Sequence, residues 1–481
     1  MTTGKSPDSS PLRRPRRAIR AFGSAIGDGV TSRRKAPNAR DNTIRFLTAV
    51  VLVLGGGALL LWLPWTDNPG KATSPVDAIF TAVAAFTGTF AVVDTAEHWS
   101  LFGKVVILLL IQVGGLGFMV GASLLLTIMR TGRGSTSLHD AVVIRDGSPA
   151  LTLRDAGQMS RAIIRYTIVV ELIGALILGL RFSRDMPFSE AMGHGIFVSV
   201  SAFCNAGFDL SGGFRSLEPY QSSYVVNFAV IALIQAGALS YLVFNDLVRS
   251  RRWSRASIDT RIILIGNGFL LAAGTVIIFI SEWGGIMSGK VLHARVLISI
   301  FQSASARSAG FQTVDLSSAN DGTLFAYTGL MFIGGAPGST AGGVKLTVAG
   351  VILISVIATL RGESEVSVMT RSLPYSLIAR AIAITVTMGL SLFLVALMLT
   401  GTEHLWGESP DFVRILFDSA SALGSSGLSS GIIPTLSSPG KVVLCVAMIF
   451  GKLGPLTLAY ALQRRQSSRR YTLPETTVRM G

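Results

Sequence analysis

Long uncharged stretches recur along the chain at the length of membrane-spanning helices. Such a helix needs about 20 consecutive apolar residues, and six stretches of 20 to 27 residues contain no charged residue. Two further apolar stretches each contain one charge, Glu171 in the first and Lys452 in the second. The pattern predicts eight spans, at Phe46–Thr66, Val105–Met129, Tyr166–Leu180, Pro219–Asn245, Ile262–Ser281, Gly322–Val344, Ala381–Thr402 and Val442–Gln463.

A shorter apolar segment lies between the two spans of each successive pair. These four segments cover residues 75–87, 187–204, 291–306 and 410–423. Two of them follow a serine and a proline, the usual start of a helix, and all are too short to cross a bilayer. The order therefore predicts an all-α integral membrane protein, in which eight transmembrane helices form four repeats of helix, re-entrant pore helix with loop, and helix around one pore.

The ends of three short segments resemble one another without gaps. Residues 201–208 read SAFCNAGF, residues 304–311 read ASARSAGF and residues 421–428 read SALGSSGL. Each ends in glycine followed by a large apolar residue. In the first repeat the corresponding stretch, residues 87–90, reads TGTF. Either Thr89 or Gly88 takes the glycine position there, and we favour Thr89, which pairs Phe90 with Phe208.

The repeated glycine ends indicate a cation pore. Irregular backbone within a membrane is tolerated only where protein buries it or where it lines a water-filled path. Glycine permits positive φ, so successive carbonyl oxygens can point the same way and replace the hydration shell of a monovalent cation. The C-terminal ends of the short helices add a negative dipole. A single small-residue string is more often helix packing, but three aligned copies favour the pore.

The charges sharpen this picture when their positions are considered. Only 14% of the residues are charged, against about 25% in a soluble domain, which excludes a soluble fold. The net charge of +15 and pI near 10.4 suggest a nucleic-acid binder when taken alone. However, 29 of the 42 basic residues fall in five segments on one side of the eight spans, with nine acidic residues. The surplus is therefore a topology signal that puts both termini in the cytoplasm.

Other chemistry finds little support in the residues. Five histidines and two cysteines without ligand spacing disfavour a transition-metal site. Gly338 and Gly343 approach a phosphate-binding loop, but Val344 stands where the lysine belongs and Lys345 comes one residue late. A membrane-embedded enzyme would need convergent acids, bases or nucleophiles. The candidates Glu171, Asp418 and Lys452 have no recognisable spacing.

Six motifs give residues 44–465 a resemblance to a known family. They are QVGGLGFM at 112–119, CNAGFDLS at 204–211, ARSAGFQTVDLS at 306–317, GGAPGSTAGGVK at 334–345, SALGSSGLSSGI at 421–432 and GKLGPLT at 451–457. The chain resembles the membrane pore subunit of the Trk/Ktr/HKT superfamily of potassium transporters, and most of all the KtrB-type subunits of its eight-span branch.

The resemblance implies that four filter segments bind the potassium ion, with sodium as an alternative and no covalent cofactor. The implied filter residues are Thr87, Gly88, Thr89, Phe90, Asn205, Ala206, Gly207, Phe208, Ser308, Ala309, Gly310, Phe311, Ser425, Ser426, Gly427 and Leu428.

The glycine-rich stretch 334–343 cannot sustain a regular helix, because it contains five glycines and Pro337. We expect it to split its span into Gly322–Ile333 and Leu346–Leu360. The resemblance implies an intramembrane gating loop here, with Lys452 as a positive barrier where relatives usually carry arginine. The implied gating residues are Gly334, Gly335, Gly338, Ser339, Thr340, Gly342, Gly343 and Lys452.

The first filter segment departs from the family pattern. Relatives usually have glycine where this chain has Thr89, and in the plant branch serine at that position accompanies sodium preference. The sequence therefore predicts potassium uptake, with a sodium-permeable or weakly selective transporter as the alternative. A non-conducting structural subunit is the alternative from a different class.

The resemblance also implies partners that composition does not show. They are a second copy in a homodimer, a cytosolic nucleotide-binding regulatory subunit (RCK-type, KtrA-like) and membrane lipid, with no nucleic acid. The expected organisation is a basic disordered tail at 1–43, pore repeats at 44–129, 161–248, 260–360 and 375–465, a cytoplasmic linker at 130–160 and a cytoplasmic tail at 466–481.

Overall fold

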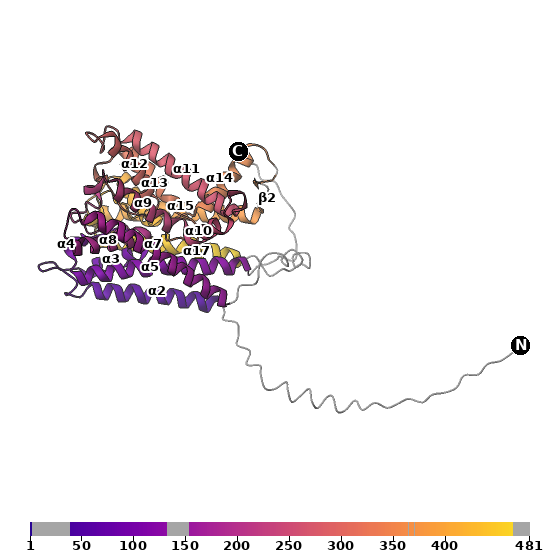
Figure 1. Cartoon of the computed structure of the whole chain (residues 1–481), viewed down its shortest axis with the longest axis horizontal. Coiled ribbons are helices and arrows are strands. Elements are labelled where there is room, and N and C mark those ends of the chain that lie inside the picture. Colours follow the sequence, from indigo (N-terminus) through magenta and orange to yellow (C-terminus); the bar gives the residue numbers. More distant parts are fainter. Residues whose placement is uncertain (2–38, 132–152, 364, 370, 465–481) are drawn as a thin grey trace, which may run out of the picture. The chain divides into compact units, whose positions relative to one another are not determined.

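The computed structural model describes Met1 and residues 39–131, 153–363, 365–369 and 371–464 (Figure 1). Almost all of the predicted N-terminal tail, most of the linker 130–160 and nearly all of the tail 466–481 lie outside these residues. The chain divides into two compact units, residues 1–52 and 53–481. The fold described below is that of the second unit.

Helices make up almost all of the regular structure in the described residues. In chain order the elements are α2 (Ala39–Leu61), α3 (Pro75–Thr87), α4 (Thr95–His98), α5 (Leu101–Thr131), α7 (Leu153–Phe182), α8 (Phe188–Phe203), η1 (Glu218–Tyr220), α9 (Tyr224–Ala238), α10 (Ser240–Ser250), η2 (Trp253–Arg255), α11 (Ile258–Ser281), α12 (Leu292–Ala306), η3 (Leu316–Ser318), α13 (Asp321–Phe332), α14 (Leu346–Leu360), β1 (Ser367–Val368), β2 (Arg371–Ser372), α15 (Tyr375–Trp406), α16 (Phe412–Gly424), η4 (Ile433–Thr435) and α17 (Ser438–Arg464). The two short strands pair antiparallel, with Val368 opposite Arg371.

The four predicted short segments are confirmed as the helices α3, α8, α12 and α16. At the start of α3 the Ser74 hydroxyl accepts the backbone N–H of Asp77 at 3.1 Å, and Pro75 occupies the first turn. This serine therefore caps the helix as its position before proline predicts. At α16 the cap is instead Asp411, two residues after Ser409, and its side chain makes no capping bond.

Four helices among the described residues are long and apolar enough to cross a membrane, at Leu101–Ser123, Gly157–Phe182, Ile258–Ser281 and Tyr375–Trp406. A fifth span is possible by length if the bent pair α9 and α10 counts as one. The span predicted over Pro219–Asn245 is not one continuous helix, because α9 and α10 meet at an angle of 93°. The chain breaks there at Ser240, whose φ of +72° is left-handed, so the helix cannot continue.

The repeats close on one another in a cycle of helix contacts. In each step the helix that follows one short helix packs against the short helix of the next repeat, namely α5 on α8, α9 on α12, α13 on α16 and α17 on α3. Figure 1 shows α3 beside α5, and α8 beside α7. The last contact brings the C-terminal repeat back to the first. The short helices therefore end in a common central region.

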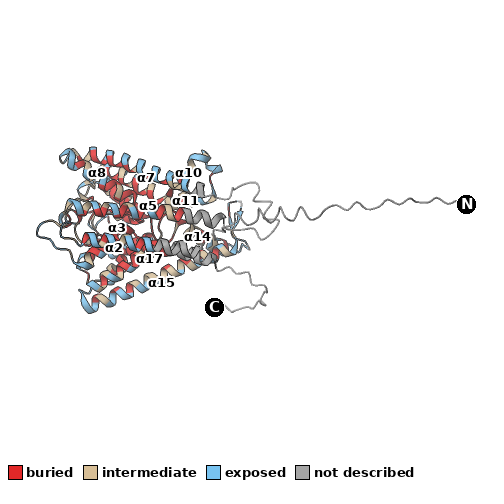
Figure 2. Cartoon of the chain, turned by 90° about the horizontal axis from the view of Figure 1, so that it is seen from below, coloured by how far each residue is buried: buried red, intermediate tan, exposed pale blue. Residues whose placement is uncertain are grey.

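The outward faces of the long helices are apolar yet exposed. Leu172 on α7, Phe269 on α11 and Leu390 on α15 are 64%, 65% and 66% exposed, and Figure 2 colours much of α15 intermediate or exposed. In contrast, small polar residues such as Ser201, Ser305 and Ser421 are fully buried near the short-helix ends. This is the reverse of a soluble protein and fits a chain whose solvent is lipid.

Candidate functional site

The four candidate filter segments begin where the short helices end. Each of the four helices is followed within two residues by a residue of positive φ, namely Gly88 (φ +71°), Asn205 (φ +54°), Ser308 (φ +91°) and Ser425 (φ +49°). The next amide reaches back into the helix, as Ala206 N–H does to Ser201 O at 2.8 Å and Ser426 N–H to Ser421 O at 2.8 Å. The backbone thereby leaves the helix axis two residues before the glycine in the second, third and fourth repeats, and one residue before Thr89 in the first.

Three glycines then bring the segments into direct backbone contact. Gly207, Gly310 and Gly427 all have φ between +71° and +80°. A Cβ on Gly207 would lie 2.6 Å from Gly310 Cα, and one on Gly310 would lie 2.9 Å from Ser426 O. No other residue type fits this approach, because an L side chain is both strained at positive φ and in collision with backbone.

In the first repeat, Thr89 lies at the position that Gly207, Gly310 and Gly427 occupy in the other three. A Cβ on Gly427 would lie 3.1 Å from Thr89 Cα, so Thr89 is the neighbour of Gly427, whereas Gly88 abuts Asn205 O. Thr89 is absent from the residues with positive φ. Its hydroxyl contacts Met448 Sδ on α17 at 2.5 Å and is 3.2 Å from Thr87 Oγ1. These contacts favour the alignment that puts Thr89 at the glycine position, on a backbone path different from the other three.

The large residue after each of these positions anchors its segment in the core. Phe90, Phe208, Phe311 and Leu428 are at most 2% exposed. The fourth repeat has the smaller side chain at this position, so its segment gains less apolar contact than the other three.

A cavity of about 380 Å³ lies directly over the junction of the segments. Its lining includes Phe90, Gly207, Gly310 and Gly427, one residue from each repeat. Three acidic residues and one basic residue also line it, Asp209, Glu218, Asp315 and Arg215. The four repeats thus share one polar chamber with excess negative charge, which raises the local concentration of cations.

The glycine-rich loop lies between α13 and α14, as the predicted split of that span requires. Its backbone bonds connect it to the broken helix of the second repeat. Ala336 N–H donates to Ala238 O at 2.9 Å, and Thr340 N–H donates to Gly237 O at 3.3 Å. The break after Ala238 leaves these carbonyls without helical partners, and the loop satisfies them.

The same loop touches the filter segments of three repeats. Asn205 Nδ2 donates to Thr340 Oγ1 at 2.9 Å, and Gly342 N–H donates to Ser308 Oγ at 3.1 Å. A Cβ on Gly342 would lie 2.4 Å from Ser425 Oγ. The loop therefore lies against the end of the candidate filter away from the cavity.

Two lysines, the buried Lys452 and the half-buried Lys345, bond to the loop. Lys452 is 2% exposed and donates to Thr340 O, while Lys345 donates to the neighbouring Ala341 O. Both ammonium groups lie over the ring of Phe118 on α5, at 5.7 Å and 5.4 Å from its centre, within the range of a cation–π contact. Lys452 was predicted as a gating residue; Lys345 was noted in the sequence only as part of a false phosphate loop.

The three residues considered for an enzyme do not form one site. Glu171 accepts from Gln112 Nε2 at 3.2 Å and lies 3.8 Å from Cys204 Sγ. Asp418 binds Ser430, and Lys452 binds Thr340. Each is engaged by a different partner, so no acid and base converge on a common reacting position.

Sequence reasoning assigned no packing role to three glycines on the helices that follow the short helices, although Gly114 and Gly451 stand in quoted motifs. A Cβ on Gly114, Gly237 or Gly451 would lie 1.9 to 2.2 Å from the carbonyl oxygen of Phe86, Phe203 or Leu423, respectively, in the last turn of the short helix. The signal was present, because IQVG at 111–114, LIQAG at 233–237 and IFG at 449–451 recur at matching places. These glycines let each short helix end pack onto backbone.

Comparison with known proteins places these features in a family. Residues 20–471 match the family model TrkH, described as cation transport protein. The chain is 36% identical to Ktr system potassium uptake protein B of Bacillus subtilis, over 88% of this chain and 95% of that one. It is 30% identical to potassium/sodium uptake protein NtpJ of Enterococcus hirae, over 94% and 100%. The crystal structure of the potassium transporter TrkH from Vibrio parahaemolyticus superposes with a TM-score of 0.68 at 18% identity, covering 92% of this chain and 88% of that one.

Proposed function

The chain belongs to the TrkH family of cation transport proteins, and we propose that it carries potassium across the cytoplasmic membrane through the junction of its four filter segments. The observation that carries this proposal is the cavity whose lining draws on all four repeats directly above their backbone contacts. A single path along this junction would pass every repeat. The sixteen filter residues named from the sequence would form it.

The chemistry of the junction suits a dehydrated monovalent cation. Backbone carbonyls at successive levels can replace water around the ion, and the left-handed glycines bring the four backbones close together. Short-helix C-termini point their dipoles toward the same region. The acidic residues Asp209, Glu218 and Asp315 would attract cations at the entrance.

We propose the eight-span topology for the membrane as well. The short helices α3, α8, α12 and α16 enter from the outside as re-entrant pore helices, and the basic segments keep both termini in the cytoplasm. The seven segments expected from the sequence belong to this same proposal.

The loop 334–343 is the proposed gate. Its bonds to Asn205 and Ser308, two of the candidate filter residues, support this role, as does the bond from Lys452 to Thr340 O. A cation leaving the filter would have to displace the loop. A Ktr system partner is proposed from similarity to Ktr system potassium uptake protein B. We further propose, from the family resemblance of the sequence motifs, that the chain forms a homodimer and that this partner is a cytosolic nucleotide-binding subunit that moves the loop.

A second candidate function is transport of sodium together with potassium. Thr89 replaces a glycine at the filter level and follows a different backbone path, so the fourfold match of carbonyls is imperfect there. The relative NtpJ is described as a potassium/sodium uptake protein. Potassium remains the favoured substrate, because the other three repeats keep the glycine.

Flux into proteoliposomes decides between these functions. We expect rubidium and potassium tracers to enter faster than sodium with the wild-type protein. Thr89→Gly should raise the potassium to sodium ratio, because removal of the Cβ allows the first segment the positive φ of the others. Thr89→Ser, which keeps the Cβ and hydroxyl, is the control and should change it little. Sodium-only flux would overturn potassium transport, and absence of all flux with the regulatory partner present would favour a structural subunit.

A further inference from the structure

A buried carboxylate lies on the short helix of the fourth repeat, at a position where the other three short helices have none. Asp418 on α16 has no exposed surface. Its Oδ1 accepts the backbone N–H of Ser430 at 3.1 Å, and its Oδ2 accepts the Ser430 hydroxyl at 2.7 Å. Ser430 follows Gly427 by three residues, at the outer end of the filter segment. The carboxylate thus holds one residue of that segment at two points.

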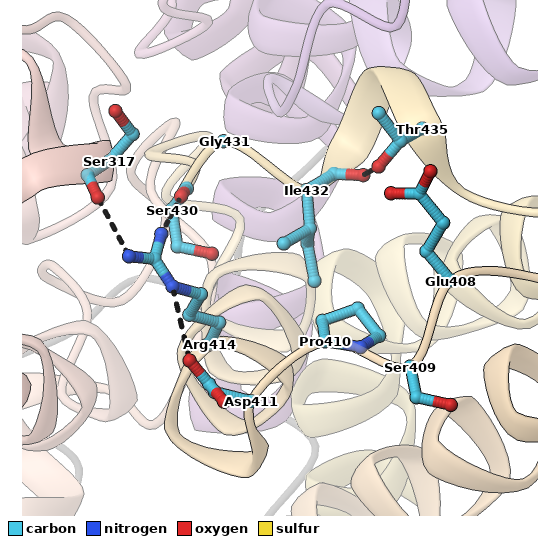
Figure 3. A pocket seen from close by; sticks show the side chains of 10 residues that line it. All are labelled: Ser317, Glu408, Ser409, Pro410, Asp411, Arg414, Ser430, Gly431, Ile432 and Thr435. Atoms are coloured by element: carbon cyan, nitrogen blue, oxygen red, sulfur yellow. Dashed lines mark hydrogen bonds and ion pairs between the residues drawn. The ribbon is translucent and has the colours of Figure 1, made fainter.

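Arg414 holds the same residue from its other side. Its guanidinium donates to Ser430 O at 2.7 Å and to Ser317 O at 2.8 Å, and its Nε lies 3.9 Å from the exposed carboxylate of Asp411 (Figure 3). Ser317 belongs to the loop after the third filter segment. Arg414 therefore ties the outer ends of the third and fourth segments together, at the wall of a cavity of about 420 Å³.

The other three repeats lack these polar groups. With the glycine position aligned, Asp418 corresponds to Phe80, Val198 and Phe301, all at most 2% exposed. Ser430 corresponds to Val92, Leu210 and Thr313. The first and second repeats therefore have apolar residues at both positions, and the third has Phe301 and Thr313.

The difference has a physical consequence. A buried carboxylate is costly unless hydrogen bonds compensate it, and charge-assisted bonds are about twice as strong as neutral ones and more directional. Apolar packing behind Phe90, Phe208 and Phe311 has no preferred direction. The fourth segment, whose anchor is the smaller Leu428, is instead positioned by directed bonds to its backbone.

We propose that Asp418 and Arg414 act as a polar clasp on Ser430, which sets the position of the fourth filter segment and through it the ion selectivity. The inference rests on the proposed function for its effect on ions. Asp418 and Arg414 are positioning residues, because they reach the ion path only through the backbone of residues 425–430.

The test compares variants in proteoliposomes. Asp418→Asn should lower the potassium to sodium flux ratio about tenfold, the change that about 1.4 kcal/mol of lost charge-assisted hydrogen bonding produces. Ser430→Ala should lower it by a smaller factor, and the double variant should be no worse than Asp418→Asn. Ser430→Thr keeps the hydroxyl and should therefore keep the wild-type potassium to sodium flux ratio. Asp411→Asn, at the exposed carboxylate beside Arg414, is the matched control and should leave it unchanged.

A second measurement separates the clasp from transport. Amide hydrogen exchange of residues 425–431 should be faster in Asp418→Asn than in the wild type, with no change in the first segment, residues 87–92. Equal loss of potassium and sodium flux with an unchanged ratio would reduce Asp418 to a stability role and overturn the proposal. If the wild type carries no potassium, the proposed function fails, and unchanged exchange at 425–431 would then overturn the clasp independently.

Discussion

The helix that follows the first short helix and the one that follows the third contain the same pair of glycines, yet only one of them breaks. Helix α5 runs without interruption from Leu101 to Thr131 through Gly114 and Gly115. In the third repeat the helix ends at Phe332, and the pair Gly334-Gly335 begins a loop. Paired glycines therefore do not by themselves interrupt a helix in this protein.

The difference lies in what surrounds each pair. A Cβ on Gly114 would lie 1.9 Å from the carbonyl oxygen of Phe86. Glycine at this position therefore allows α5 to pack closely against the end of α3. Gly335 is followed by Pro337, which cannot donate a helical hydrogen bond, and the amide of Ala336 finds Ala238 O on a neighbouring helix. The glycine pair in α5 lets this helix pack closely against its neighbours. The pair Gly334-Gly335 instead begins a loop whose backbone bonds to the end of α9.

The largest expected effect comes from filling the contact in the unbroken helix. Gly114→Ala should destabilise the protein by about 1–3 kcal/mol or more, because the Cβ collides with backbone that cannot move freely. Potassium flux should fall as well, because the displaced carbonyl of Phe86 lies in the last turn of α3, directly before the first filter segment. Thermal unfolding in detergent and tracer flux measure the two effects.

Gly117→Ala on the same helix is the control. No atom lies within 4 Å of a Cβ at that position, and alanine is the better helix former. Its stability and flux should match or exceed those of the wild type. Equal behaviour of the two alanine variants would show that close packing is not why α5 needs Gly114.

An intermediate effect is expected from releasing the loop of the broken helix. Lys452→Gln removes the ammonium group that donates to Thr340 O. A hydrogen bond to a charged group contributes about 1.5–3 kcal/mol to stability. The loop should leave the filter more often, and potassium flux without the regulatory partner should rise about tenfold.

The matched control for the loop is Lys441→Gln, on the same helix α17. Lys441 pairs with Asp77 at 2.8 Å and has no recorded bond to the loop among the described residues. Its flux without the partner should not rise. A fall in flux with Lys452→Gln would contradict a latching role for that lysine.

The smallest effect is expected from Pro337→Ala. The loop keeps its bonds from Ala336 to Ala238, from Thr340 to Gly237 and from Leu346 to Gly335, so its path should persist without the proline. Flux should change by less than about twofold, since an exposed or loop substitution away from such bonds usually costs within about 0.5 kcal/mol. A change as large as that of Lys452→Gln would show that the proline, rather than the bonds to α9, causes the break.

The second repeat shows why sequence reasoning succeeded at one break and failed at another. Its helix bends by 93° between α9 and α10 with no proline near, only Gly237 three residues before Ser240. The uncharged run of 27 residues there looked like a regular span. The carbonyl oxygens of Gly237 and Ala238 accept hydrogen bonds from backbone amides of the loop of the third repeat, about 100 residues away in the chain.

In the candidate filter, too, some features were predictable from the sequence and others were not. The glycine-containing strings showed where each segment ends, and the short helices before them begin and end within about two residues of the expected positions. Asp418 was visible in the sequence as a buried charge, but its bond to Ser430 depends on how the chain turns after Gly427. The position of Thr89 beside Gly427 likewise needed the neighbouring repeat.

The sequence by itself determined the class of protein, the short helices, their repeated glycine ends and the split of the third repeat. These features follow from local hydrophobic length, from glycine and proline, and from caps, which act within a few residues. Only the tertiary structure decided the bend in the second repeat, the holding of the loop by two lysines and the clasp on the fourth segment. Each of these depends on hydrogen bonds to groups that other parts of the chain leave unpaired, and no local pattern records such a partner.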